Sequence, residues 1–374
     1  MAEGVTGLEL RSTVTDAGKL ELTLEPVTLD PPGEGEVIVR VQAAPVNPSD
    51  LGLLLGPADP ASAVAGGTAE RPTLTLDIAP ERMTMLASRV GESMAVGNEG
   101  AGTVIQAGPG AEALLGRTVG MLGGAMYAQY RKLPVRDVVP LKDGQTAADG
   151  ASMFVNPLTA LAFVETMRAE GHKAIVHTAA ASNLGQMLNR ICLADGVPLV
   201  NVVRSAAQAA ILRDIGATHI VDSTAPDFRE ALMAAIRATG ATLAFDAVGG
   251  GKLGGQILAA MEAVANEGTA YSRYGSTSFK QLYIYGVLDT SPTVLNRNFG
   301  FSWSVGGWLL TPFLAKAGKE VLGRLRQRVV DELTTTFASR YTRTIGLAEA
   351  LDPEVMRAYE RKATGEKFLI DPSR

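Results

Sequence analysis

A stretch of small residues at positions 178–185 has the composition of a turn that binds phosphate groups. It joins a short apolar run, 173–177, to residues 186–194, whose apolar side chains recur at helical spacing up to Asp195-Gly196. Small side chains let the backbone approach a pyrophosphate, and a helix N-terminus offers N–H groups to the anion. The turn reads A-x-x-S-x-x-G from Ala179 to Gly185 rather than G-x-G-x-x-G, so an ordinary turn of a parallel sheet is the alternative.

The next apolar run, 198–203, ends in Arg204-Ser205, 19 positions beyond Gly185. An NAD site usually carries Asp or Glu at about this distance, where the carboxylate binds the ribose 2′-hydroxyl. An arginine instead suits a 2′-phosphate, because its guanidinium makes charge-assisted, forked hydrogen bonds. The sequence therefore predicts NADPH rather than NADH, with a solvated surface arginine as the alternative.

Soft metal ligands are scarce in the chain. They are His172, His177, His219 and the single cysteine, Cys192, and no two of them have the spacing C-x-x-C or H-x-x-x-H. We expect structural or surface histidines, a buried and unreactive thiol, and no metal. One cysteine also excludes an internal disulfide and fits a reducing compartment.

The composition limits the classes of molecule that this protein could bind. A net charge of −5, without a basic run longer than two residues, argues against nucleic acid and anionic membranes. The first residues lack the pattern of a secretory signal, and the apolar tract 299–313 is too short to span a bilayer, so we expect a cytoplasmic protein. Its length of 374 residues favours two domains.

The first part of the chain has the alternation of β-strands, at residues 8–14, 20–26 and 36–43. Asn47 and Asp50 follow in a turn-rich segment. Residues 56–96 have little periodicity apart from a short strand-like run and a short helical pattern at 81–90, and such tracts are usually functional or mobile. The strand pattern resumes at 97–108, where Glu99 is a lone carboxylate among glycines.

The middle of the chain alternates strands and helices. After Arg204 we expect helices at 206–214, 227–238 and 254–264, with strands at 218–222, 241–248 and 282–286. Such alternation predicts a doubly wound parallel sheet, whose ligands bind at the carboxyl ends of the strands, where glycines follow Val248. We expect residues 312–337 to form one long helix.

In order and spacing, eight segments of the chain resemble the medium-chain dehydrogenase/reductase superfamily, in its zinc-free quinone reductase and enoyl reductase branch. They are VNPSD (46–50), GNEGAGTV (97–104), AMYAQY (125–130), NPLTA (156–160), the small-residue turn, GATHIVD (216–222), FDAVGG (245–250) and ATGEKFLI (363–370). Asn47 and Asn98 stand where zinc-dependent members have Cys and His. The resemblance covers nearly the whole chain.

The resemblance implies an α/β protein with two domains. An N-terminal β-rich, GroES-like catalytic domain would span 1–150 and be completed by 338–374, and a Rossmann-type domain would span 151–337. A homodimer is implied, formed through the last strand of the Rossmann sheet, which would be LYIYG at 282–286. The residues expected to bind NADPH are Thr159, Ala180, Ser182, Asn183, Leu184, Gly185, Arg204, Ser205, Val248 and Tyr274.

The resemblance also implies hydride transfer from NADPH to a small conjugated acceptor, a quinone or an α,β-unsaturated carbonyl compound, without metal. The tyrosine that donates a proton in enoyl thioester reductases is absent after VNPSD, and the segment before GNEG is unusually long. Tyr127 and Asn47 are the candidate hydrogen-bond donors, with core packing and a turn as their structural alternatives. Enoyl thioester reduction, or a non-catalytic NADPH-binding role like that of crystallin and redox-sensing relatives, are the alternative functions.

Overall fold

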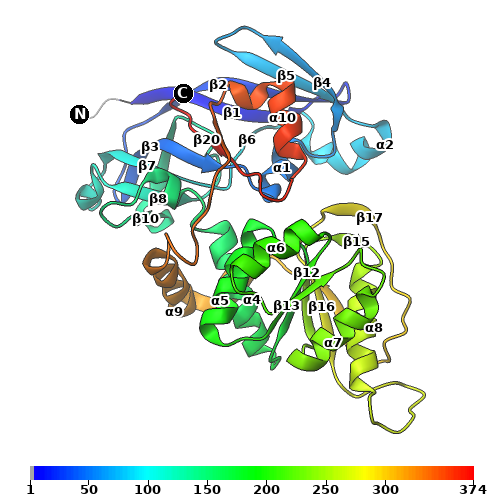
Figure 1. The fold of residues 1–374 in the computed structure, drawn as a ribbon. Coiled ribbons are helices and arrows are strands. Elements are labelled where there is room, and N and C mark those ends of the chain that lie inside the picture. Colours follow the sequence, from blue (N-terminus) through cyan, green and yellow to red (C-terminus); the bar gives the residue numbers. More distant parts are fainter. Residues whose placement is uncertain (1–3) are drawn as a thin grey trace. The chain divides into compact units, whose positions relative to one another are not determined.

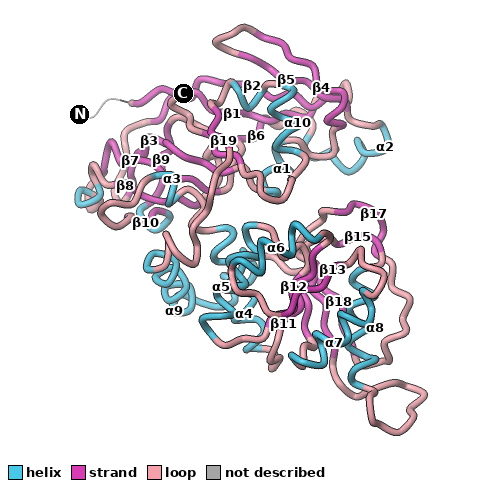
Figure 2. The backbone as a smooth tube through the Cα atoms, in the orientation of Figure 1, coloured by secondary structure: helices cyan, strands magenta, loops and turns pink. Residues whose placement is uncertain are grey.

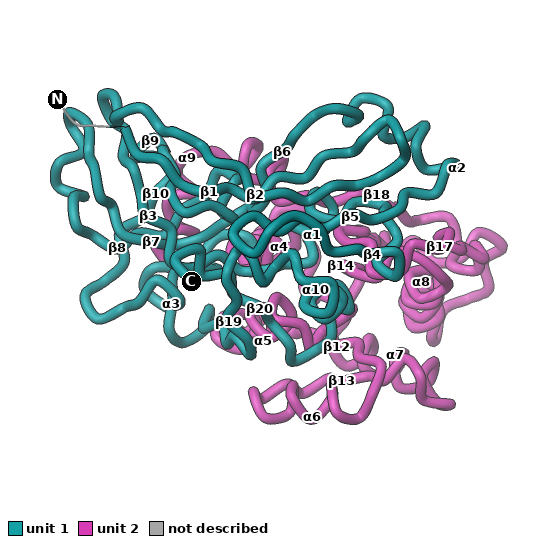
Figure 3. The backbone as a smooth tube through the Cα atoms, turned by 90° about the horizontal axis from the view of Figure 1, so that it is seen from above, with its two compact units in different colours: residues 1–155, 329–374 teal, residues 156–328 magenta. Residues whose placement is uncertain are grey.

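A computed structural model describes residues 4–374 (Figure 1). The chain divides into two compact units, one of residues 1–155 with 329–374 and the other of residues 156–328 (Figure 3). The chain thus leaves the first unit after Val155 and returns to it at Val329, whereas the sequence suggested changes at 150 and 338. The assignment of a catalytic and a dinucleotide-binding role to these units stays a prediction.

The first unit is built on two mostly antiparallel sheets, ordered β4-β5-β2-β1-β6 and β10-β8-β7-β3-β20-β19, with β9 also paired to β3. Its strands are β1 (Val5–Val14), β2 (Lys19–Leu29), β3 (Glu36–Pro45), β4 (Asp59–Gly67), β5 (Pro72–Asp77), β6 (Ser93–Ala95), β7 (Glu99–Ala107), β8 (Thr118–Leu122), β9 (Tyr130–Pro134), β10 (Val138–Pro140), β19 (Arg343–Ile345) and β20 (Phe368–Ile370). Its helices are α1 (Pro48–Leu54), α2 (Pro80–Met83), α3 (Ala147–Gly150) and α10 (Pro353–Glu360), with short 3₁₀ turns η1 (Thr84–Arg89), η2 (Glu112–Leu114), η3 (Val135–Asp137) and η4 (Glu349–Leu351).

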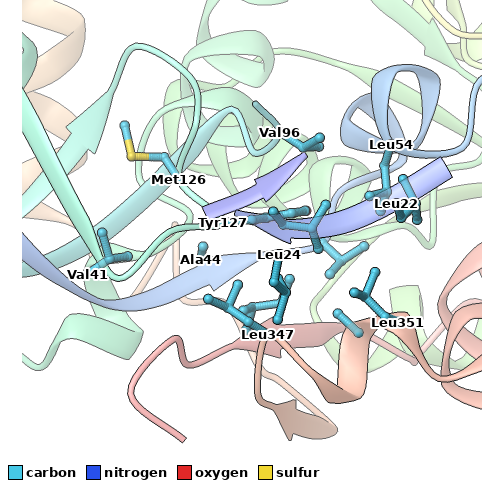
Figure 4. Packing of buried hydrophobic residues seen from close by; sticks show 14 of the residues in the cluster. Leu22, Leu24, Val41, Ala44, Leu54, Val96, Met126, Tyr127, Leu347 and Leu351 are labelled. Carbon is cyan, nitrogen blue, oxygen red and sulfur yellow. The ribbon is translucent and has the colours of Figure 1, made fainter. Parts of the chain in front are cut away.

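The C-terminal tail completes the core of this unit. Strand β20 pairs antiparallel with β3, where Leu369 faces Pro45. Leu347, Leu351 and other tail residues join one buried apolar cluster with the N-terminal strands. Figure 4 shows this packing around Tyr127. Because the tail supplies part of the buried surface, the two ends of the chain depend on each other for stability.

The long segment 56–96 is more regular than its sequence suggests. Strands β4 and β5 form an antiparallel hairpin that extends the first sheet beyond β2, with an irregularity between Asp59 and Val64. Strand β4 is mostly exposed, so it lacks the apolar alternation that marks a half-buried strand. The expected helical pattern at 81–90 becomes the short helix α2 and the 3₁₀ turn η1.

The second unit contains a six-stranded parallel sheet with the order β13-β12-β11-β14-β16-β18. Its strands are β11 (Ile175–His177), β12 (Leu199–Val203), β13 (His219–Asp222), β14 (Leu243–Asp246), β16 (Lys280–Ile284) and β18 (Trp303–Gly307), with a separate pair β15 (Gly249–Gly251) and β17 (Asp289–Thr293). Its helices are α4 (Val155–Ala169), α5 (Asn183–Asp195), α6 (Ala206–Asp214), α7 (Phe228–Thr239), α8 (Leu253–Ala265) and α9 (Leu310–Asp331).

Helices lie on both faces of this parallel sheet. Helices α5 and α6 lie on one side, and α7 and α8 lie on the other (Figures 1 and 2). Helix α5 ends at Gly196, which takes the left-handed conformation at φ 66°. The expected apolar stripe of this helix is buried at Met187, Leu188 and Ile191, but Leu193 is exposed. The predicted α/β class, with an antiparallel β domain and a doubly wound parallel sheet, is confirmed.

Two expectations about the second unit are wrong. The strand at 282–286 does not form the edge of the sheet, because β18 pairs parallel with β16 outside it. The segment 312–337 is not one continuous helix. Gly318 interrupts α9 with φ 82° and ψ 171°, and the helix ends at Asp331. Glycine accepts a positive φ that costs other residues energy, so it permits this break.

Within residues 4–374, no helix combines the length and the apolar character needed to cross a lipid bilayer.

Candidate functional site

The small-residue turn leads directly into helix α5, and its own side chains stabilise that junction. Ala179 has a positive φ of 50°. Ser182 is the N-cap of the helix, and its Oγ accepts a hydrogen bond from the Gly185 N–H at 3.1 Å. By accepting this hydrogen bond, the short polar side chain stabilises the start of the helix close to the end of β11. The first-turn N–H groups, at Asn183 and Leu184, are those that a bound phosphate would take at such a terminus.

Gly185 lies too close to the backbone of the preceding turn for any other residue. A Cβ atom built on it would lie 2.2 Å from the carbonyl oxygen of Ala180. The third glycine of dinucleotide-binding turns is needed for this close helix–strand packing. Ala180 itself is fully buried and takes the inner side of the turn. These residues fit the pyrophosphate of a dinucleotide, although the first two glycines of the usual motif are absent.

Arg204 lies at the end of β12, at the same edge of the sheet as the turn. Its side chain is exposed, and among residues 4–374 its guanidinium has no hydrogen-bond or ion-pair partner. Its backbone N–H donates to Gln208 Oε1 at 3.0 Å, and the neighbouring Ser205 caps helix α6. A cation held only by its backbone at this edge remains available for an anionic ligand.

Val248 follows β14 at the same edge of the parallel sheet and is half-buried. The carboxylate of Asp246 fixes this turn by accepting hydrogen bonds from Thr178 Oγ1 at 2.6 Å and from the Val248 N–H at 2.9 Å. The following glycines serve packing rather than ligand approach. A Cβ on Gly250 would lie 2.6 Å from the carbonyl oxygen of Ser291 beside β17.

Thr159 and Tyr274 are less well placed for the predicted cofactor role. Thr159 is buried on helix α4. Tyr274 lies in the connection between α8 and β16, which enters the amino edge of the sheet, opposite the edge that carries Ser182 and Arg204. There it packs edge-on against Phe301. The order of elements already implies this, because a connection from a helix to the following parallel strand enters the amino edge of the sheet. Tyr274 is therefore not part of the site proposed below.

In the first unit, a second cluster forms around Asn47, the N-cap of α1. Its Nδ2 donates to Glu99 Oε1 at 2.8 Å, and its Oδ1 is buried without a hydrogen-bond partner among residues 4–374. Glu99 also accepts from the backbone N–H groups of Phe154 and Val155 through its other oxygen. Asp50 accepts from the N–H groups of Asn47 and Asn98, each at 2.8 Å.

Tyr127 lies in the same unit and is fully buried. Its hydroxyl donates a hydrogen bond to the carbonyl oxygen of Pro45 at 3.0 Å. Figure 4 shows its ring among Leu24, Ala44 and Leu347. Burial first, and the charge of Asp50 second, raise its pKa well above the ordinary value. The structure thus brings Asn47 and Tyr127 into neighbouring positions but commits the tyrosine hydroxyl to the backbone.

Three residues join this cluster that the sequence did not single out. Lys367 Nζ donates to Ser152 Oγ at 2.8 Å and lies 5.3 Å from the centre of the Tyr341 ring. The hydroxyls of Ser152 and Tyr341 are themselves 2.8 Å apart. Lys367 belongs to the ATGEKFLI segment, so its place in the family pattern was the available signal, but its chemistry was not apparent from type and spacing.

Burial dominates the electrostatics of this cluster. It raises the pKa of Asp50 to about 7, against the lowering effect of the two N–H donors and with a further increase from the charge of Glu99. It also raises the pKa of Glu99 above the ordinary value. Burial lowers the pKa of Lys367 to about 8, although the nearby charges of Glu99 and Asp50 oppose that shift. The unit therefore holds two groups, Asp50 and Lys367, whose charge changes near neutral pH.

His172 and Cys192, which the sequence predicted to be a structural or surface histidine and an unreactive thiol, lie in the second unit. His172 hydrogen-bonds Thr242 and Gln281 through its two ring nitrogens. Cys192 is buried, and burial raises the pKa of its thiol to about 12, so it is unreactive at neutral pH. No group of three or more His, Cys, Asp or Glu side chains within residues 4–374 has the arrangement of a metal site.

Comparison with known proteins supports the assignment of the fold. No protein-family model matches the chain. It is 28% identical over 219 residues to a mitochondrial enoyl-[acyl-carrier-protein] reductase of Xenopus tropicalis, which covers 54% of this chain and 51% of that protein. It is also 26% identical over 259 residues to a mycocerosic acid synthase-like polyketide synthase of Mycobacterium tuberculosis, covering 67% of this chain and 11% of the synthase. The chain thus matches about half of the reductase and a small part of the synthase.

Solved structures match over the whole chain. A protein described as an NADPH:quinone reductase from Mesorhizobium loti is 25% identical, with a TM-score of 0.71 and coverage of 100% of this chain and 99% of that one. The Etr1p complex with NADP and crotonyl-CoA is 19% identical, with a TM-score of 0.68 and coverage of 98% and 100%. The two units have the fold of medium-chain dehydrogenase/reductases. Within that superfamily, the chain is similar to members of the quinone reductase and enoyl reductase branch.

Proposed function

We propose that this protein is an NADPH-dependent oxidoreductase that transfers hydride to a conjugated acceptor, a quinone or an α,β-unsaturated carbonyl compound. The observation that carries the proposal is the unpartnered guanidinium of Arg204, at the same sheet edge as the Ser182-capped turn. The guanidinium of Arg204 suits a 2′-phosphate, and the turn capped by Ser182 suits a pyrophosphate. The M. loti protein at 25% identity, described as an NADPH:quinone reductase, supports this reading.

The cofactor would supply the hydride, and the chain would supply binding and orientation. The first-turn N–H groups of α5 would hold the pyrophosphate, while Arg204, with Ser205 beside it, would hold the 2′-phosphate. Conjugated acceptors need no Lewis acid, because their carbonyl spreads the developing negative charge. Hydrogen-bond donors are then enough to stabilise an enolate.

For the donor in the first unit, we favour Asn47 over Tyr127. Asn47 Nδ2 gives one hydrogen to Glu99 and retains a second, whereas the single hydroxyl hydrogen of Tyr127 goes to Pro45. Two backbone N–H groups fix the carboxylate of Glu99, and this carboxylate holds the amide of Asn47 in one orientation. We therefore propose that Tyr127 supports the segment before Asn47 rather than donating a proton.

The second candidate function is enoyl thioester reduction. Its support is the similarity to the X. tropicalis enoyl-[acyl-carrier-protein] reductase, which at 28% identity is higher than that to the quinone reductase structures. Against it stands the absent tyrosine after VNPSD. A homodimer and a cytoplasmic location remain predictions. Because β18 pairs with β16, a dimer formed through the edge of the parallel sheet would use β18 rather than the strand at 282–286.

The test is the loss of near-ultraviolet absorbance of NADPH and NADH, measured in parallel with a simple quinone and with an unsaturated acyl thioester. Turnover with NADPH and the quinone supports the leading proposal, whereas turnover only with the thioester supports the second. NADPH binding without turnover on either acceptor would instead favour the non-catalytic role. Absence of NADPH binding would contradict all three.

A further inference from the structure

A pocket of about 420 Å³ opens at the carboxyl ends of β16 and β18, within the second unit. Residues 284–287 and 307–309 line it, together with Pro312, and none of these carries a charge. This volume is ordinary for a small-molecule site, and the carboxyl ends of parallel strands are where doubly wound folds bind ligands. The pocket therefore suits a flat, largely apolar group.

Two of the residues that line this pocket, Trp308 and Tyr285, carry a polar hydrogen on the side chain. Trp308 directs its indole N–H to Thr166 Oγ1 at 3.3 Å. The other is Tyr285, a half-buried residue whose hydroxyl lies 2.7 Å from Nε2 of His177. Phe163 packs edge-on against the Tyr285 ring, with ring centres 4.8 Å apart, and so limits its movement.

His177 is fully buried at the end of β11, and its ring is nearly coplanar with that of Tyr285, at 16°. Burial lowers its pKa to about 3, so the imidazole is neutral and carries one hydrogen. Among residues 4–374, Nδ1 has no hydrogen-bond partner. Among residues 4–374, Tyr285 is consequently the one hydrogen-bond partner that orients the ring nitrogens of this histidine.

The unpartnered Nδ1 decides where the hydrogen lies. A buried N–H without an acceptor is rarer and costlier than an unsatisfied acceptor. The hydrogen therefore belongs on Nε2, which donates it to the oxygen of Tyr285. The tyrosine hydroxyl, relieved of donating to His177, keeps its own hydrogen for another acceptor.

We propose that Tyr285 donates a hydrogen bond to the carbonyl oxygen of a planar conjugated ligand in this pocket, and that His177 is its positioning residue. This inference rests on the proposed function, which offers two sources of that chemistry. They are the carboxamide of the nicotinamide ring and the carbonyl of the acceptor. Both combine a flat apolar body with one strong hydrogen-bond acceptor.

The test compares Tyr285→Phe with Tyr283→Phe. The control removes the hydroxyl of a tyrosine two positions earlier, on β16, which donates to Glu170 and does not line the pocket. Each variant and the wild type are titrated calorimetrically with NADPH and with 2′-phospho-ADP-ribose, which lacks nicotinamide. Each is also titrated with menadione, followed by tryptophan fluorescence, since Trp308 lines the pocket.

If the nicotinamide is the source, Tyr285→Phe weakens NADPH binding roughly three- to tenfold, the range for one neutral hydrogen bond, and leaves the fragment unaffected. If the acceptor is the source, NADPH binding is unchanged and menadione affinity falls by the same factor. Equal affinities of wild type and Tyr285→Phe in all three titrations would overturn the proposal. A wild type that binds neither NADPH nor the fragment would refute the proposed function, while the menadione titration would still decide the role of Tyr285.

The role of His177 is tested with His177→Gln, which keeps an N–H donor near the position of Nε2, and with His177→Leu, which does not. Melting temperatures and circular dichroism establish that each variant is folded. We expect His177→Gln to bind within about twofold of the wild type and His177→Leu to lose as much affinity as Tyr285→Phe. A folded His177→Leu protein with wild-type affinity for all three probes would exclude the positioning role.

Discussion

Asn47 and Glu99 meet through a buried hydrogen bond of 2.8 Å, although 52 positions separate them in the chain. Two backbone N–H groups, of Phe154 and Val155, complete the set of donors to the same carboxylate. Three segments distant in the sequence are thus held together at one side chain that is wholly buried. Because the donors of Asn47 and Phe154 are buried and that of Val155 is partly buried, Glu99 is needed to satisfy them.

Replacing Glu99 with alanine should strongly destabilise the first unit. Each buried donor left without an acceptor costs about 1–3 kcal/mol, and relaxation will recover part of the sum, so we expect a loss of about 3–5 kcal/mol. Chemical denaturation of Glu99→Ala against Glu92→Ala, an exposed control, measures it. A loss below about 1 kcal/mol would mean that water reaches these donors.

Asp50 should make stability depend on pH. Its pKa is raised from 3.8 to about 7 in the folded protein, so the folded state holds a proton that the unfolded state releases between those values. The free energy of unfolding contributed by Asp50 is therefore largest below pH 4 and declines as the pH rises toward 7, by roughly 3–5 kcal/mol.

His177 makes stability depend on pH with the opposite slope, because its lowered pKa makes the folded state resist protonation below pH 6.5.

The difference in the free energy of unfolding between the wild type and Asp50→Asn isolates the contribution of the Asp50 carboxyl, since asparagine does not titrate. Urea denaturation at intervals from pH 4.5 to 8 should show the wild type losing stability relative to the variant as the pH rises. A difference independent of pH would show that Asp50 stays ionised throughout.

Tyr127 should matter more for stability than for turnover. Tyr127→Phe removes the hydrogen bond to Pro45 but keeps the packing seen in Figure 4, so we expect a loss of about 0.5–1.5 kcal/mol. NADPH affinity should not change, and the turnover number should stay within about twofold. A hundredfold lower turnover number in a protein of unchanged stability would instead assign Tyr127 the proton-donating role.

Local patterns predicted most of the second unit. The small-residue turn, its helix and the strand before Arg204 were readable because each depends on residues close in sequence. Strand β18 of this unit and strand β4 of the first unit could not be predicted. Their sequences, WSVGG and DPASAVAGG, lack alternation, and the strands are held by their neighbours in the sheet. The break of helix α9 at Gly318 could not be predicted either, because an isolated glycine is compatible with an unbroken helix.

The candidate site in the first unit was predictable only in part. Asn47 and Tyr127 were selected from motifs, but Lys367, Ser152 and Tyr341 meet only because the C-terminal tail folds back onto β3. Contacts of that separation leave no periodic signal in one sequence. The hydrogen bond between His177 and Tyr285 could not be predicted for the same reason. It links the carboxyl ends of β11 and β16, and β14 lies between these two strands in the sheet.

Two glycine substitutions should have opposite effects. Gly185→Ala places a methyl group 2.2 Å from the Ala180 carbonyl oxygen and forces the backbone apart, costing about 1–3 kcal/mol and weakening NADPH binding. Gly323→Ala, on α9 with nothing within 4 Å of the added Cβ, should stabilise the helix by about 0.5–1 kcal/mol. Thermal unfolding compares the two. Equal melting temperatures would contradict the close approach of α5 to the turn before it.

The most direct test of the central claim is the affinity of wild type and Arg204→Gln for NADPH and NADH, measured by calorimetry at fixed ionic strength. Arg213→Gln, at the far end of α6, is the control. Loss of a charge-assisted contact should weaken NADPH binding roughly tenfold to a hundredfold and leave NADH binding nearly unchanged. Equal losses for both cofactors, or tighter binding of NADH by the wild type, would contradict the assignment of this sheet edge to a 2′-phosphate.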